Sequence, residues 1–145
     1  MPVRPADVRL AAMDLLARRE HSRSELMEKL GRRFDKALIE TVLDTLADDG
    51  LQSDRRFAES FVRHRAQRGY GPLRIRQELQ QRGVAVSEIS LAFESNEINW
   101  LDVIGGVVTR KYGGQPASEL KEKARRQRFL LYRGFSHDHI KEVLD

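Results

Sequence analysis

Basic side chains dominate the chemistry that this sequence could perform. A guanidinium group is a planar fork of N–H donors that matches carboxylates and phosphates, and a lysine ammonium adds a compact point charge. These groups crowd two stretches of the chain, and a tyrosine lies on the same helical face as the last three of them. The candidate residues are Arg55, Arg56, Arg63, Arg65, Arg68, Arg74, Arg76, Arg82, Lys121, Arg125, Arg128 and Tyr132. We predict that they bind an anionic surface.

The charge distribution supports this prediction. The 145-residue chain has a net charge of +4, but residues 54–82 carry 8 basic and 3 acidic groups, and residues 110–133 carry 8 and 2. The segment between these blocks, residues 83–109, carries 4 acidic groups and no basic ones. Two basic blocks favour a polyanion or an acidic protein groove as the partner. The alternative is that the arginine-rich helices are simply solvated faces.

Other chemistry has weak support. His137 and His139 flank Asp138, but positions i and i+2 of a helix point in very different directions, so we interpret them as a capped first helical turn rather than a metal site. The Gly69–Gly71 turn follows an expected helix, whereas phosphate loops follow strands. The chain has no cysteine, which removes disulfides and thiolate metal sites. We therefore expect no enzyme activity, no metal and no cofactor.

The elements that position these side chains are expected to be helices, because one apolar pattern occurs three times. Phe34, Val84 and Phe135 are each followed by apolar residues five, eight and nine positions later, and the anchors are separated by 50 and 51 residues. Such spacing marks one helical face after a turn. A repeat of this period indicates tandem supersecondary units that offer a long surface to a large partner.

We predict an all-α protein of three tandem three-helix repeats that form an elongated, curved array, with boundaries at residues 1–52, 53–96 and 97–145. Ser22 and Glu25 form a capping box, and Asp35 can cap the next helix. Val107–Thr109 could also form a strand, but the repeat favours a helix. The basic helix of the third repeat is expected to start between Pro116 and Ser118, with Leu120, Ala124 and Leu131 on one face.

Two motifs in the middle repeat point to a known family. The first is Asp-Arg-Arg-Phe-Ala at residues 54–58, and the second is the tract from Gly69 to Val84, with a glycine-rich turn, Ile-Arg-Gln-Glu-Leu and Arg-Gly-Val. Together with the threefold repeat, they resemble the bacterial RecX family over nearly the whole chain. The segment at residues 123–135, with Phe-Leu-Leu-Tyr-Arg-Gly-Phe, is similar to the closing repeat of that family.

The resemblance implies a negative regulator of the recombinase RecA. Proteins of this family bind in the helical groove of the RecA–DNA filament, inhibit its ATPase, strand-exchange and co-protease activities, and limit filament growth. The expected partners are therefore the RecA filament and the DNA within it. The rival hypothesis is a stand-alone DNA-binding protein with helix-turn-helix-like units. The first residues lack the apolar segment of a signal peptide and no stretch reaches transmembrane length, so we expect a cytoplasmic protein. We also expect a monomer.

Overall fold

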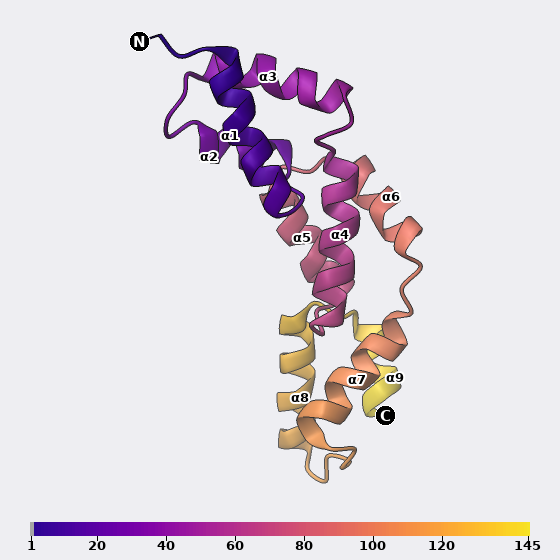
Figure 1. The fold of residues 1–145 in the computed structure, drawn as a ribbon. Helices are drawn as coiled ribbons and strands as arrows, with labels where there is room; N and C mark the ends of the chain where they lie inside the picture. Colours follow the sequence, from indigo (N-terminus) through magenta and orange to yellow (C-terminus); the bar gives the residue numbers. More distant parts are fainter. Residues whose placement is uncertain (1) are drawn as a thin grey trace. The chain divides into compact units, whose positions relative to one another are not determined.

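The computed structural model describes residues 2–145, and within that range all regular secondary structure is helical (Figure 1). Its helices are α1 (Pro5–Arg18), α2 (Arg23–Leu30), α3 (Lys36–Asp48), α4 (Asp54–Gln67), α5 (Pro72–Gln81), α6 (Val86–Asn96), α7 (Trp100–Tyr112), α8 (Leu120–Arg133) and α9 (His137–Leu144). The predicted all-α tandem-repeat fold is confirmed, and Val107–Thr109 is helical. Among the described residues, every helix is too short or too polar to span a bilayer.

Several helix boundaries follow directly from side-chain capping. At the start of α2, the Ser22 hydroxyl accepts from the Glu25 N–H at 3.1 Å, and the Glu25 carboxylate accepts from the Ser22 N–H at 3.1 Å. At the start of α9, the Ser136 hydroxyl accepts from the His139 N–H at 3.2 Å, so His139 lies in a capped first turn, as predicted. Asp35 occupies the N-cap position of α3, but its side chain makes no capping hydrogen bond.

Helix α8 differs from the sequence prediction in its start and in its buried face. It begins at Leu120 rather than at residues 116–118, and Leu120 is 87% exposed. The buried residues of α8 are Arg126 and Leu130. Arg126 can be buried because Glu122 accepts from its Nε at 3.2 Å and the Gln115 carbonyl accepts from its Nη1 at 2.7 Å. These bonds orient the helix, so the expected face at Leu120 and Leu131 remains exposed.

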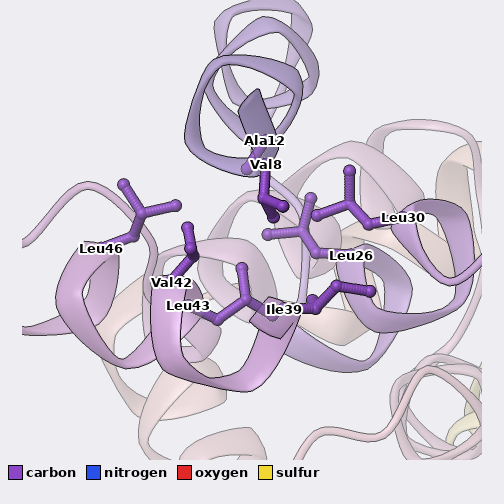
Figure 2. Close-up of a cluster of buried hydrophobic side chains, with 8 residues drawn as sticks. All are labelled: Val8, Ala12, Leu26, Leu30, Ile39, Val42, Leu43 and Leu46. Carbon is purple, nitrogen blue, oxygen red and sulfur yellow. The ribbon is translucent and has the colours of Figure 1, made fainter. Parts of the chain in front are cut away.

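The chain divides into two compact units, and this division cuts through the three middle helices. Unit 1 is formed by residues 1–60 and 79–92, and unit 2 by residues 61–78 and 93–145. The core of unit 1 joins α1, α2 and α3, with Val8 and Ala12 facing the leucines of α2 and the apolar side of α3 (Figure 2). Ile39, Leu43 and their neighbours on α3 are fully or almost fully buried, as the helical spacing requires.

The core of unit 2 joins α7, α8 and α9. Its buried members are Ile104, Val107, Leu130, Phe135 and Ile140. The repeat anchors Phe34, Val84 and Phe135 each lie in the connection between the second and third helices of a repeat. The isoleucines five residues after them, Ile39, Ile89 and Ile140, are at most 3% exposed. The three-repeat boundaries themselves remain a prediction.

Each unit also contains a junction where the end of one helix meets the start of another. In unit 2, the N–H groups of Gly71 and Leu73 at the start of α5 donate to the carbonyls of Arg133 and Gly134 after α8, at 2.8 and 3.0 Å. A Cβ on Gly71 would overlap the Gly134 carbonyl. In unit 1, the Ser22 hydroxyl before α2 donates to the Arg82 carbonyl after α5 at 2.8 Å. Backbone groups left over at helix ends are thereby satisfied.

Candidate functional site

The arginines of unit 1 that the sequence singled out are bonded to acidic groups. Arg55 donates from Nε to Glu88 at 2.6 Å and from Nη2 at 3.4 Å. This hydrogen bond raises the pKa of Arg55. Arg56 donates from Nε to Glu20 at 3.0 Å and from Nη1 to the Gly50 carbonyl at 2.7 Å. The positive charges of these two partly exposed side chains are therefore largely compensated by acidic groups of unit 1.

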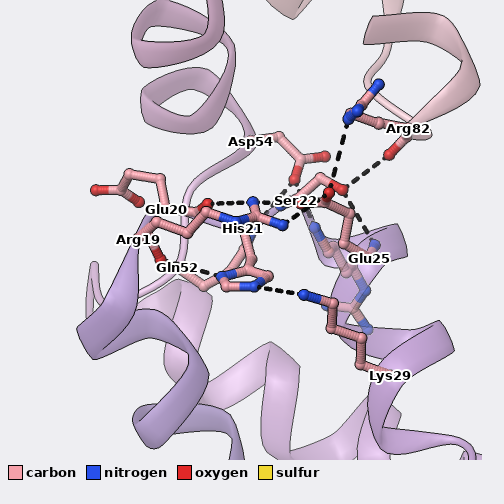
Figure 3. Close-up of polar contacts among 10 residues, drawn as sticks. Arg19, Glu20, His21, Ser22, Glu25, Lys29, Gln52, Asp54 and Arg82 are labelled. Atoms are coloured by element: carbon pink, nitrogen blue, oxygen red, sulfur yellow. Dashed lines mark hydrogen bonds and ion pairs between the residues drawn. The ribbon is translucent and has the colours of Figure 1, made fainter. Parts of the chain in front are cut away.

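Arg82 belongs to a polar cluster around the start of α2 (Figure 3). Its Nε lies 3.7 Å from the Glu25 carboxylate, which also accepts from Arg19 at 3.1 Å. Burial raises the pKa of Glu25, but the hydrogen bonds from Arg19 and the Ser22 N–H outweigh it, so the net pKa is lowered. Within the same cluster, the buried His21 lies 3.1 Å, Nε2 to Nζ, from Lys29.

In unit 2, a tyrosine ring is surrounded by guanidinium groups. The Cζ atoms of Arg65, Arg74 and Arg133 lie 3.8, 4.6 and 4.6 Å from the centre of the Tyr70 ring. Arg65 donates twice to Glu78, each time at 2.9 Å, and Arg74 donates to the same carboxylate at 3.4 Å. The negative face of an aromatic ring attracts cations, so Tyr70 gathers these charges into one place.

Two further candidates contact aromatic rings of unit 2. The Arg76 guanidinium lies 4.4 Å from the centre of the Phe93 ring. The Arg74 guanidinium lies 4.8 Å from the Tyr132 ring and donates to the Tyr132 carbonyl at 3.2 Å. Tyr132 itself is 71% exposed, so one face of its ring is open to a ligand.

The remaining candidates extend into solvent. Arg125 donates to Glu122 at 3.1 Å and stays 63% exposed. Four of the exposed candidates make no ion pair or side-chain hydrogen bond to any residue within 2–145, and they are Arg63, Arg68, Lys121 and Arg128. The structure therefore separates the predicted set into residues that are paired within the protein and residues that are available to a partner. That any of them binds a partner stays a prediction.

Three cations of unit 2 were missed by the sequence analysis. Arg110 and Lys111 lie in the last turn of α7, and Arg133 is the last residue of α8. Together with Arg68, Val107 and Phe129 they line a hollow of about 230 Å³. All three belong to the second basic block, so the charge count could have indicated them. The helical spacing of Lys121, Arg125 and Arg128 instead favoured a different face of α8.

Comparison with known proteins gives the family. The chain matches the three domain descriptions "RecX, first three-helix domain" at residues 9–46, "RecX, second three-helix domain" at residues 53–92 and "RecX, third three-helix domain" at residues 103–144. It is 48% identical over 141 residues to "Regulatory protein RecX" of Pseudomonas putida KT2440, covering 97% of this chain and 90% of that protein. The chain belongs to the RecX family.

Further relatives agree with this assignment. The protein of the same name from Ectopseudomonas mendocina is 49% identical over 141 residues, covering 97% of this chain and 94% of its own length. A crystal structure of regulatory protein RecX superposes with a TM-score of 0.75 at 25% identity, covering 96% of this chain and 72% of that one. RecX from Lactobacillus salivarius, at 22% identity, has the same fold with a TM-score of 0.77, covering 96% and 93%. Members of this family are thus regulatory proteins of three-helix domains.

Proposed function

We propose that this chain is a negative regulator of the RecA recombinase. It binds in the groove of the RecA–DNA filament, inhibits the ATPase, strand-exchange and co-protease activities of RecA, and limits filament growth. The observation that carries the proposal is its membership of the RecX family across all three domains. The proposal includes action in the cytoplasm as a monomer, with the repeats bounded at residues 1–52, 53–96 and 97–145.

The distribution of available positive charge supports an anionic partner, as the RecA–DNA filament would be. Arg63, Arg68, Lys121 and Arg128 are exposed and have no internal acidic partner among the described residues. Exposed cations of this kind steer an anionic partner into contact and then bind it. Their presence on α4 and α8 means that more than one repeat contributes to the surface.

The decisive experiment is the DNA-dependent ATPase rate of RecA with and without this protein. We expect the rate to fall as the protein is added, with the loss saturating at a fixed ratio of protein to RecA. An unchanged rate, together with filaments that do not co-sediment the protein, would contradict the proposal. Binding to bare DNA without any effect on RecA would instead favour the stand-alone DNA-binding alternative.

A surface variant tests whether the available cations mediate the inhibition. Arg63→Gln, Lys121→Gln and Arg128→Gln together should weaken inhibition while the helical CD signal is retained, because these side chains have no internal partner among the described residues. Arg74 and Arg76 are unsuitable for this test, since they contact Tyr70, Tyr132 and Phe93. The matched control removes three charges elsewhere, with Arg18→Gln, Arg32→Gln and Lys36→Gln. Equal inhibition by both variants would count against this surface.

A further inference from the structure

The hollow of unit 2 that is lined by Arg68, Arg110, Lys111 and Arg133 has an unusual charge balance. Its walls come from the end of α4, the last turns of α7 and the second half of α8, with Val107 and Phe129 as its apolar lining. Four of these six described residues are cations and none is acidic. At about 230 Å³, the hollow can hold a phosphate group together with water, since each water takes about 30 Å³ in the liquid.

The guanidinium group of Arg133, at this hollow, is held in place by neutral groups. Arg133 donates from Nη1 to the carbonyls of Arg68 and Gly69, at 3.0 and 3.4 Å. Its Cζ lies 4.6 Å from the centre of the Tyr70 ring and 5.2 Å from that of Phe129. Carbonyls and rings orient a guanidinium group without cancelling its charge. Arg133 is therefore rigidly placed and still attractive to an anion.

The other cations are uncompensated too. Lys111 lies 4.3 Å, Nζ to ring centre, from Phe129, and Arg68 and Arg110 are exposed side chains with no acidic partner among the described residues. The three helix ends at this site each contribute roughly half a negative charge. That total is well below the four positive charges, so the hollow keeps a positive potential.

A glycine sets the distance between the walls. Gly69 has φ +85°, and a Cβ at this position would lie 2.8 Å from Val107 Cγ2, 3.5 Å from Arg133 Nη1 and 3.6 Å from Arg110 Nη2. The absence of a side chain lets the turn after α4 lie against α7, and it brings the Gly69 carbonyl to Arg133. The site is thus organised before any ligand arrives, which lowers the cost of binding.

We propose that this hollow binds the phosphates of a nucleic-acid backbone, with Arg68, Arg110 and Lys111 as direct contacts and Arg133 as the fixed charge behind them. Each phosphate of a nucleic-acid backbone carries a negative charge, so a phosphate in the hollow interacts with several cations at once. Guanidinium groups match phosphate oxygens in a fork geometry. This inference assigns the contact to one hollow of unit 2, at residues that the sequence analysis missed, and its test does not require RecA.

The test is fluorescence anisotropy with the full-length chain, without RecA, and a labelled oligothymidylate. Arg68→Gln, Arg110→Gln and Lys111→Gln together should weaken binding by more than about ten-fold at 50 mM salt. The slope of log affinity against log salt should fall by about 2 for a single strand. The control, with Arg18→Gln, Arg32→Gln and Lys36→Gln, loses the same charge from side chains of unit 1 that are 69%, 73% and 79% exposed. It should lose much less affinity.

Each possible result either supports the proposal or overturns it. Equal loss in the two variants, or an unchanged salt slope in the hollow variant, overturns the proposal. Two further probes separate other ligands: if tripolyphosphate or labelled oligoglutamate depends on the three residues while the oligonucleotide does not, the hollow serves a free polyphosphate or an acidic protein instead. CD spectra verify that each variant is folded. RecA ATPase inhibition is measured in parallel, so the RecA proposal stands or fails separately.

Discussion

Arg55 and Arg56 of unit 1 and Arg133 of unit 2 are held by opposite kinds of group, although Arg65 and Arg74 of unit 2 are paired with Glu78. In unit 1, Arg55 and Arg56 donate to the carboxylates of Glu88 and Glu20, so their positive charges are compensated by acidic groups of the protein itself. In unit 2, Arg133 is held by carbonyl oxygens and aromatic rings, so its charge persists. A charge count along the sequence treats each of these arginines as one positive charge. The chemistry of the bonded group decides whether a cation stabilises the protein or attracts a ligand.

The largest effect should come from removing the ring that gathers charge in unit 2. Tyr70→Leu keeps apolar volume but loses three guanidinium contacts, each worth about 0.5–1 kcal/mol. We expect the free energy of unfolding in urea to fall by about 1.5–3 kcal/mol. Tyr132→Leu, at a ring that is 71% exposed and contacted by Arg74, is the control and should cost less than about 1 kcal/mol. Equal costs would show that aromatic contacts do not distinguish unit 2.

A pH-dependent effect is expected in unit 1. Burial lowers the pKa of His21, and the nearby charges of Arg19 and Lys29 lower it further, against the effects of the Arg19 carbonyl and Glu25. Since the folded state binds a proton less readily than the unfolded state, the His21 contribution to stability is complete above about pH 6.5 and is lost as the pH falls below it.

The measurement is urea unfolding at pH 7.5 and pH 5.5. The wild-type chain should lose more stability on acidification than His21→Gln, which has no imidazole to protonate. The same loss in both proteins would assign the pH dependence to other groups. This comparison tests whether unit 1 depends on a neutral buried side chain as well as on paired charges.

The smallest effect on stability should come from releasing a paired arginine of unit 1. Glu88→Gln removes the carboxylate that binds Arg55, whose side chain is 41% exposed, so the free energy of unfolding in urea should fall by less than in Tyr132→Leu. The released guanidinium should then behave like the uncompensated Arg133 of unit 2 and strengthen binding to an oligothymidylate a few-fold at low salt. Unchanged binding would indicate that position in the fold matters more than compensation.

Local signals were sufficient to predict most of the fold. The Ser22 capping box and the buried Ile39, Ile89 and Ile140 all follow from the sequence, because capping and helical periodicity depend on residues a few positions apart. The start of α8 was predicted too early. Its buried face was also missed, because the burial of Arg126 depends on bonds to Glu122 and Gln115 that periodicity does not reveal.

The candidate site was less predictable than the fold. Arg55 and Glu88 are 33 positions apart, and Arg133 and Arg68 are 65 apart, so tertiary packing alone brings these groups together. The sequence shows the two basic blocks, but it does not separate compensated from uncompensated cations, and their binding role stays a prediction. Arg110, Lys111 and Arg133 were missed because they come from two different helices.

The backbone junction between the starts and ends of helices has a consequence for how such chains can be recombined. At Gly71 and Gly134, N–H donors at the start of α5 meet carbonyl acceptors at the end of α8, and a Cβ on either glycine would overlap atoms of the opposing segment. The connection is therefore directional, with a donor end and an acceptor end that are not interchangeable. A chimaera assembled from repeats of different relatives should fold only if both glycines are inherited together and the order of the repeats is kept.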